Sequence, residues 1–364
     1  MLADRAAVRR EKKRHLIPCA PRNGARDDSQ AASLHNRTMF AILSVTFPFF
    51  ALVFCGFFAA RKGLLPLEAI PGLNTFVLFF ALPCMLFRFG SSTPITVLLD
   101  PALALVYLAC ALLMVTLLVL LTRNAQRGGH IGWNDAAMGA LVGAFPNTGF
   151  MGVPLLVAFL GAASVGPAIL TIVIDIVLTS SLCIALSRLD RGGGDAWGAV
   201  KSALKGVASN PMPWSILLGA VASASGVVLP APLASTLGLL ADSASPVALF
   251  TLGAVLARSH MLASQDVAHA VPWQDFVPIA LAKLLLHPLL LLGLAYGARA
   301  LGFRLEPAAI TVVVLVAALP SAGNVTLLAE RYGANNGRIA RIILVSTVGA
   351  FFTFSATVAL LVGH

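Results

Sequence analysis

Long apolar runs separated by short polar gaps organise the chain from residue 40 to residue 362. A helix needs about 20 predominantly apolar residues to cross the hydrocarbon core of a bilayer. The uncharged run that begins at residue 136 is too long for one crossing, and Gly161 with Gly166-Pro167 divides it. The pattern predicts ten membrane-spanning helices, at 40–60, 69–89, 101–122, 136–160, 165–187, 211–229, 237–257, 277–298, 307–329 and 340–362.

Composition indicates the same class, an all-α polytopic membrane protein. The 364 residues are 58% hydrophobic and 11% charged, with a mean hydropathy of +0.89. About 25% of the residues of an average soluble domain are charged, so an ordinary soluble enzyme and a disordered chain are both excluded. The net charge of +10 does not indicate a nucleic-acid partner, because residues 1–38 hold nine of the 25 Lys and Arg and four of the 15 Asp and Glu. The remaining charges occupy short gaps between apolar runs, as in loops at a membrane surface.

Residues 1–38 differ from the rest of the chain. They contain Arg9-Arg10-Glu11-Lys12-Lys13-Arg14 and no apolar core of a signal peptide. Their polarity predicts a disordered extension, either a targeting or lipid-binding arm or a segment that is not translated. Met39 stands directly before the first apolar run and is the start that we favour.

The basic residues of the gaps predict the orientation, since Lys and Arg concentrate in cytoplasmic loops. The gaps after the odd-numbered helices hold twelve Lys and Arg, including the loop 188–210, and the gaps after the even-numbered helices hold only Arg88, Arg299 and Arg304. Both termini are therefore expected outside and the loop 188–210 in the cytoplasm. A basic extension outside would violate the same rule, which favours a start at Met39; the competing explanation is a helix count that is wrong by one.

Two similar stretches reveal an internal repeat. Ala144-Phe145-Pro146-Asn147-Thr148-Gly149 and Ala318-Leu319-Pro320-Ser321-Ala322-Gly323 share the pattern A-x-P-x-x-G, and each falls in the fourth helix of a five-helix unit. Since five is odd, the second copy enters the membrane from the opposite side. The sequence thus predicts two inverted repeats, 39–187 and 211–364.

Proline and glycine break both fourth helices at matching positions. A break exposes backbone N–H and C=O groups, which membranes tolerate only where protein or a wet cavity satisfies them. Paired breaks point to a transporter's binding site, although each alone could be a packing kink. The half-helix after each break aims its positive end at the crossing and favours a carboxylate. The candidate substrate-binding residues are Pro146, Asn147, Thr148, Gly149, Pro320, Ser321, Gly323 and Asn324.

Three ionisable residues fall inside predicted helices. Asp175 lies near the middle of the fifth, and Lys283 and His287 share one face of the eighth. A charge at mid-bilayer costs on the order of 3 kcal/mol by insertion scales, so such groups pair or line a pathway. They are candidates for a proton or cation relay. The alternatives are a structural ion pair between Asp175 and Lys283, a Lys283 that extends toward the membrane surface, and a core His287.

No catalytic or metal-binding pattern is present. The seven His are scattered, no Ser-His-Asp set stands out, and no phosphate-binding P-loop occurs. The five cysteines have no metal or redox spacing, so they are expected to be inert buried thiols. Neither an enzyme nor an ATP-driven pump is predicted, and no cofactor or metal is expected.

The residues at the first break resemble a known family. Phe145-Pro146-Asn147-Thr148-Gly149-Phe150-Met151-Gly152-Val153-Pro154 is similar to the broken fourth helix of the auxin efflux carrier (PIN-like) family, which includes bacterial malonate and malate carriers. Supporting similarities lie at 74–83, 249–253 and 318–320. The second half departs from the pattern, because Ser321 follows Pro320 and Asn324 comes three residues later.

The resemblance implies ten helices in two inverted repeats, with helices 4 and 9 crossing at their prolines. Helices 1, 2, 6 and 7 would form a scaffold, also the surface of a homodimer, while the others move. It implies carriage of small organic anions, with Asn147 at the substrate site; the short loop 188–210 makes auxin itself a weak guess. We therefore expect a secondary carrier of malonate-like or malate-like anions in the bacterial inner membrane, coupled to H⁺ or Na⁺. A channel or sensor of the same architecture is the alternative.

Overall fold

The computed structural model describes residues 24–92, 100–124, 131–189, 211–227, 229–265 and 271–362. This part of the chain is helical and contains no named strand, only one isolated bridge between Pro146 and Ser321. The α-helices of the first half are α1 (Gly24–Arg61), α2 (Ile70–Phe76), α3 (Leu82–Ser92), α5 (Pro101–Asn124), α6 (Trp133–Ala144), α7 (Val153–Leu160), α8 (Val165–Ile174) and α9 (Ser180–Leu186). Those of the second half are α11 (Pro211–Ser225), α12 (Ala231–Gln265), α13 (Val277–Leu281), α14 (His287–Ala300), α15 (Pro307–Ala318), α16 (Val325–Tyr332) and α17 (Asn336–Val362).

Seven helical segments of the described chain are long and apolar enough to cross a membrane. Several join two α-helices through a π-helical turn: η2 (Val77–Ala81), η5 (Asp175–Thr179) and η9 (Ala282–Leu286). The predicted ranges 136–160 and 307–329 are not among the seven, because each is broken in the middle, into α6 and α7 and into α15 and α16. The range 211–229 holds α11, which ends at Ser225 and is too short for the same criterion. An all-helical membrane architecture is confirmed, while ten crossings remain a prediction.

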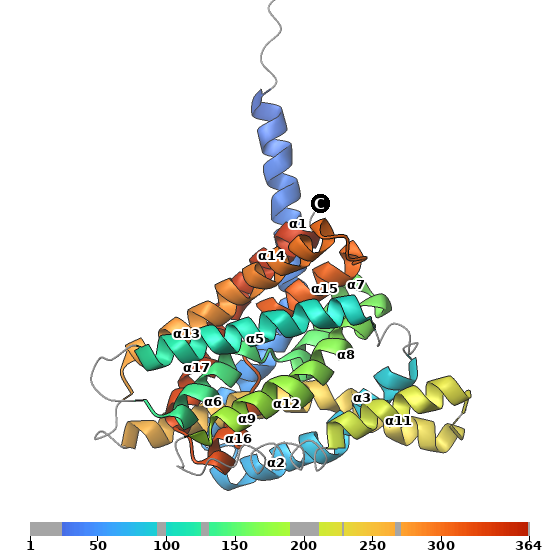
Figure 1. Ribbon diagram of the computed structural model, residues 1–364. Coiled ribbons are helices and arrows are strands. Elements are labelled where there is room, and N and C mark those ends of the chain that lie inside the picture. Colours follow the sequence, from blue (N-terminus) through green and yellow to red (C-terminus); the bar gives the residue numbers. More distant parts are fainter. Residues whose placement is uncertain are drawn as a thin grey trace, which may run out of the picture.

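The helix α1 begins well before Met39. Residues 24–38, expected to be disordered, continue the helix that the apolar residues form. Extending an existing helix requires no new nucleus, and this stretch contains Ala, Arg, Gln and Leu, which favour helices. Figure 1 shows that this end of α1 leaves the bundle as a single helix. Residues 1–23 lie outside the described residues, and the start at Met39 stays a prediction.

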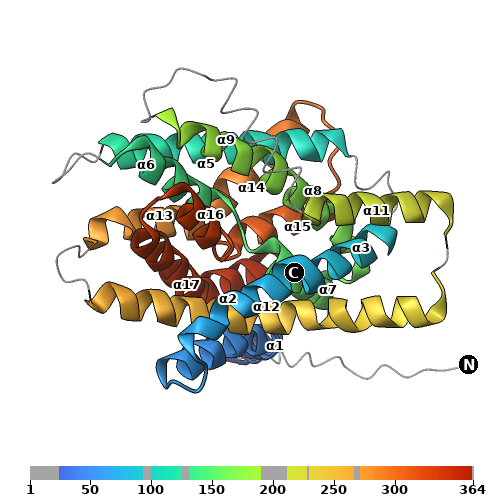
Figure 2. The ribbon, with the colours of Figure 1, turned by 90° about the horizontal axis from the view of Figure 1, so that it is seen from below.

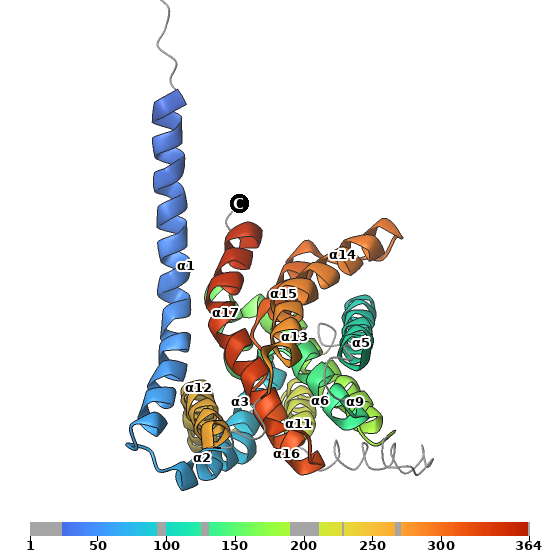
Figure 3. The same ribbon diagram turned by 90° about the vertical axis from the view of Figure 1, so that its left-hand side faces the viewer.

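Two helix pairs pack through glycines on one side of the molecule. A Cβ on Gly56 of α1 would overlap the backbone of Phe250 in α12, and one on Gly253 of α12 would overlap the backbone of Val53. Gly90 of α3 and Gly219 of α11 are packed against each other's helices in the same way. Small residues let membrane helices approach closely without a gap. Figure 3 shows α1 standing beside α12 at this edge.

The remaining helices surround the two breaks. Figure 2 shows α5, α6 and α9 on one side and α1, α2 and α12 on the other, with α15, α16 and α17 between them. The largest cluster of buried apolar side chains runs through α5, α6, α8, α15 and α17. The C-terminal end of α17 lies beside the point where α1 leaves the bundle (Figure 1). The last described residues and the start of the apolar part of α1 are therefore at one end of the molecule.

The loop predicted for 188–210 is described only at Arg188 and Leu189; residues 190–210 lie outside the described residues. Its cytoplasmic location stays a prediction.

Candidate functional site

The two proline breaks meet in space. The backbone leaves the helical conformation at Phe145, after α6, and at Leu319, after α15. The two extended segments then run antiparallel, with Asn147 N–H donating to Pro320 C=O at 2.8 Å and Ala322 N–H donating to Phe145 C=O at 3.0 Å. Proline lacks the N–H that would continue each helix. One donor and one acceptor of each break are therefore satisfied by the other break, 174 residues along the chain from Pro146 to Pro320.

Helices restart on the far side of each break. Residues Thr148–Gly152 form the π-helical turn η3, which leads into α7, and Asn324 precedes α16. The Asn147 carbonyl accepts the N–H groups of Met151 at 3.2 Å and Gly152 at 3.0 Å. The first N–H groups of a helix have no carbonyl within it to bind, and they point along the axis away from the helix. The starts of η3 and α16 both lie at the crossing, and the N–H groups of Thr148, Val325 and Thr326 donate there to the carbonyls of Pro146, Ala322 and Gly323.

Several polar side chains at the crossing are buried without a partner. Asn147, Thr148 and Ser321 are exposed by 2%, 1% and 0%, and none of Asn147 Nδ2, Thr148 Oγ1 and Ser321 Oγ has a hydrogen bond. Asn324 Oδ1 is unpartnered as well. Leaving a buried polar group unpaired costs about 1–3 kcal/mol, and most such groups in proteins are paired. A polar ligand or ordered water could supply hydrogen bonds to these clustered unpartnered atoms.

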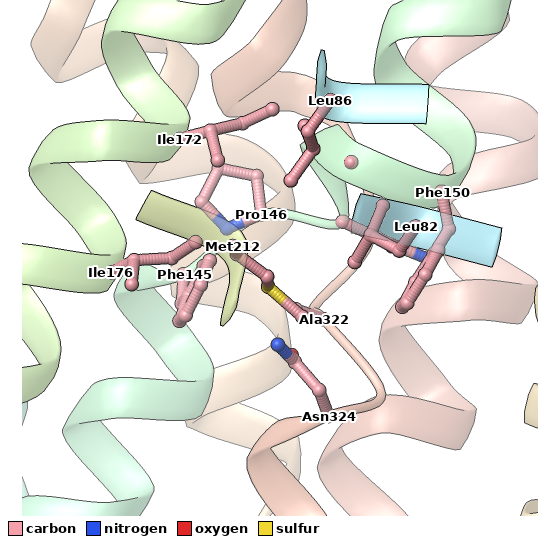
Figure 4. Close-up of a pocket in the computed structure, with 12 residues that line it drawn as sticks. Leu82, Leu86, Phe145, Pro146, Phe150, Ile172, Ile176, Met212, Ala322 and Asn324 are labelled. Atoms are coloured by element: carbon pink, nitrogen blue, oxygen red, sulfur yellow. The ribbon is translucent and has the colours of Figure 1, made fainter. Parts of the chain in front are cut away.

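Two small cavities flank the crossing. One is lined by Pro146, Asn147 and Asn324 together with apolar side chains of α3, α8 and α11, among them Leu86, Ile172 and Met212 (Figure 4). The other lies toward α2 and α12 and is also lined by Asn147 and Asn324. Each holds about 20 Å³, the room of about one water molecule. The crossing is therefore closed around its polar groups, and a carboxylate ligand requires it to widen.

The structure brings together all eight residues predicted to bind substrate. Gly149 lines one cavity and Gly323 the other, while Pro146 and Ser321 form the bridge. A side chain on Gly323 would overlap Leu252 of α12, so the absence of a side chain keeps α12 close to the crossing. Their role in binding substrate stays a prediction.

Asp175 is fully buried and hydrogen-bonded. Its carboxylate accepts the Tyr107 hydroxyl at 2.7 Å from α5 and the Thr179 hydroxyl at 3.1 Å from one turn along its own helix. Asp175 is the first residue of η5, and π-helical turns are frequent at functional sites. Tyr107 was not singled out from the sequence, although a tyrosine in an uncharged span is a natural partner for a buried acid.

Lys283 is also fully buried, with its own partners. Its ammonium donates to the Ala317 carbonyl at 2.7 Å and lies 2.9 Å from His287 Nδ1. His287 is 1% exposed, and its Nε2 has no partner. Among the described residues no ion pair joins Asp175 to Lys283; the ion pair found there is Arg88 with Asp242. The direct pair that the sequence left open is not formed, and Lys283 does not reach the molecular surface.

Two further residues make contacts that were not predicted. Ser245 of α12 donates to the Phe150 carbonyl in η3 at 2.8 Å. Arg338, expected in a loop, lies in α17 with 3% of its surface exposed, and donates to the carbonyls of Asp135 at 2.7 Å and Asp275 at 3.0 Å. Only tertiary contacts distinguish this buried arginine from a loop arginine.

The described residues contain no group of three or more His, Cys, Asp and Glu that could hold a metal ion. Cys110 and Cys183 are buried and free, as expected. Cys55 is free but exposed on α1, so its predicted burial is wrong.

Comparisons with known proteins agree with this architecture. Residues 41–358 match the model of a family described as membrane transport protein. A "Putative malonate transporter" of Rhizobium meliloti is 30% identical over 314 residues, which are 85% of this chain and 92% of that protein. The "Uncharacterized transporter YfdV" of Escherichia coli K12 is 26% identical over 84% of this chain and 93% of its own length. "Auxin efflux carrier component 8" of Arabidopsis thaliana is 26% identical over 78% of this chain and 87% of its own.

The family match spans nearly all of the apolar part of the chain, and the described helices have the length and composition of membrane spans. The chain is therefore an integral membrane protein and belongs to the membrane transport protein family that includes the auxin efflux carriers.

Proposed function

We propose that the protein is a secondary carrier of small organic anions, which bind between the breaks at Pro146 and Pro320. The observation that carries the proposal is the cluster of unpartnered polar atoms on Asn147, Thr148, Ser321 and Asn324 beside two helix starts. Uncharged donors and helix N-termini bind carboxylates without the desolvation cost of a buried cation. The name of the Rhizobium relative points to malonate as the first candidate, with malate-like dicarboxylates and monocarboxylates next.

The proposal includes ten membrane crossings in two inverted repeats, both termini outside, in a bacterial inner membrane. The pair of reciprocal backbone bonds at the breaks supports the repeat, because each half contributes one donor and one acceptor. Figure 1 shows the start of the apolar part of α1 and the end of α17 at one end of the molecule, which supports the even number of crossings. The glycine-packed helices α1, α3, α11 and α12 would be the scaffold and the homodimer surface, and the helices around the crossing would move against them.

Coupling to H⁺ or Na⁺ is proposed to involve Asp175. This carboxylate is fully buried, and its hydroxyl partners, Tyr107 and Thr179, can pair with it in either protonation state. If Asp175→Asn folds and transports with the pH and sodium dependence of the wild type, the coupling role is wrong.

Counterflow in liposomes tests the function directly. Vesicles preloaded with unlabelled malonate should take up labelled malonate transiently above its external concentration, because a carrier exchanges the two. Empty vesicles and vesicles with Asn147→Ala protein are the controls. Uptake that follows the gradient without saturation or counterflow would favour a channel, and binding without flux would favour a sensor.

A further inference from the structure

The crossing contains helix ends of both signs. The starts of η3 and α16 bring partial positive charge, while the ends of α6 at Ala144 and of α15 at Ala318 bring partial negative charge to the same place. The partial positive charges of the two helix starts and the partial negative charges of the two helix ends approximately cancel. Helix dipoles alone therefore do not explain why an anion would be preferred over a neutral molecule of the same shape.

Lys283 removes this balance at one of the four ends. Its ammonium donates to the carbonyl of Ala317, the next-to-last residue of α15 and three positions before Pro320. A cation at a helix C-terminus neutralises the partial negative charge of the free carbonyls. The last turns of both helices are closed by backbone groups, since Phe145 N–H donates to the Leu141 carbonyl at 2.9 Å and Leu319 N–H donates to the Val316 carbonyl at 3.1 Å; the last turn of α15 has the Lys283 contact in addition. The crossing is thus electrostatically asymmetric, with the excess positive charge on the α15 side.

Two neighbouring groups fix the position of Lys283 Nζ. It lies between the Ala317 carbonyl at 2.7 Å and His287 Nδ1 at 2.9 Å, and the side chain is fully buried. The nearest buried acid, Asp175, is bound by the hydroxyls of Tyr107 and Thr179 and forms no ion pair with the ammonium. Ile172 and Ile176, on the same helical segment as Asp175, line the cavity at the crossing, while the Asp175 carboxylate contacts α5 through Tyr107. The lysine therefore contacts the crossing through Ala317, whereas the carboxylate of Asp175 contacts α5.

We infer that Lys283 is a specificity-determining residue: by capping the end of α15 it makes the crossing prefer anions over neutral molecules of the same shape. This role is a fixed charge and not a proton relay. It rests on the proposed function, because it assigns charge selectivity to the same site.

The first test compares malonate with malonamide, its neutral isostere, as ligands of the purified full-length protein. Lys283→Met is combined with Asp175→Asn, so that no unbalanced charge is left in the core. We expect the double variant to lose about tenfold in malonate affinity relative to the wild type while malonamide affinity is retained. Lys62→Met, which removes the same charge from the exposed turn after α1, is the matched control and should bind malonate unchanged.

The single variant Asp175→Asn distinguishes the effect of the lysine from the effect of the carboxylate. If it folds, its malonate affinity should equal or exceed that of the wild type, because the remaining lysine is then unopposed. Equal loss of malonate and malonamide in the double variant would mean a structural role and would overturn the inference, as would unchanged malonate affinity.

A second test requires no substrate. Asn324→Cys, in a chain whose native cysteines are replaced by Ser or Ala, places a thiol at the crossing, where Asn324 lines both cavities. The ratio of its reaction rates with anionic and cationic methanethiosulfonates reports the local potential. We expect the ratio to fall about tenfold on adding Lys283→Met and Asp175→Asn, with no change for a thiol introduced by Leu64→Cys, at a position that is 82% exposed.

An unchanged ratio for the Asn324→Cys thiol would overturn the inference whatever the substrate is. A wild-type protein that binds no carboxylate would instead overturn the proposed function, and the thiol ratio would still decide the role of Lys283.

Discussion

Two polar regions lie in the apolar interior, and they are built in opposite ways. At the crossing, Asn147, Thr148 and Ser321 are uncharged, and Asn147 Nδ2, Thr148 Oγ1 and Ser321 Oγ have no hydrogen-bond partner. In the cluster formed by Tyr107, Asp175, Thr179, Lys283 and His287, the charged groups have hydrogen-bond partners. An unpaired buried polar group lowers the stability of the ligand-free protein, and a bound ligand can supply the missing hydrogen bond. A buried charge with hydrogen-bond partners already has those bonds from the protein itself. The first region is thus suited to binding, and the second to keeping a fixed charge near it.

Single removal of one charge from the cluster should have the largest effect on stability. Either Asp175→Asn or Lys283→Met leaves the opposite charge buried and uncompensated, which costs about 3–5 kcal/mol. The double variant should recover most of the loss, because the net charge of the cluster is restored. Thermal unfolding of the wild type, the two single variants and the double variant in detergent measures these losses. Additive losses in the double variant would show that the two charges are independent.

Asn147→Ala should separate binding from stability at the crossing. The variant removes an amide whose Nδ2 has no partner, so the melting temperature should be unchanged or slightly raised. Substrate affinity should fall by about 1–3 kcal/mol, the value of a buried hydrogen bond lost on one side only. Asn336→Ala is the matched control, since Asn336 Oδ1 is also unpartnered but lies at the start of α17. Equal loss of substrate affinity in both variants would contradict a special role for the crossing.

Pro146→Ala tests whether the break itself is required. With an N–H restored at residue 146, α6 can extend by another hydrogen bond, and Asn147 would be drawn away from Pro320. The expected result is a small gain in thermal stability, about 1 kcal/mol or less, with a marked loss of transport. Pro154→Ala, at the start of α7, keeps the break and is the control. Full transport by Pro146→Ala would mean that the break is a packing kink.

Ser245→Ala should have a small effect on stability and a clear one on the transport rate. It removes the hydrogen bond from α12 to the Phe150 carbonyl in η3, worth about 1 kcal/mol. If α12 is scaffold and η3 moves, this bond breaks in every cycle, so the transport rate should change more than substrate affinity. Ser243→Ala, which loses only a bond to Leu240 of the same helix, should leave both unchanged. An effect on affinity alone would place Ser245 in binding and not in the motion.

Much of the candidate site was predictable because it contains proline and ionisable residues, which are uncommon or costly inside membrane helices. Pro146 and Pro320 interrupt apolar runs at matching positions, and Asp175 and Lys283 are expensive in a bilayer. Partners were not predictable. Tyr107, Ser245 and the Ala317 carbonyl have no distinguishing pattern, and Arg338 was assigned to a loop because it falls in the gap between the predicted helices 307–329 and 340–362.

The sequence by itself determined the membrane class, the approximate positions of the seven long apolar segments and the two breaks, because hydrophobic length and proline act locally on the backbone. Only the tertiary structure decided that the breaks bond to each other, that Asp175 and Lys283 take separate partners, and that Lys283 caps the helix leading into Pro320. Hydrogen bonds between distant segments depend on how whole helices pack, and side-chain type along the chain does not specify which carbonyl or hydroxyl will lie within about 3 Å of a buried charge.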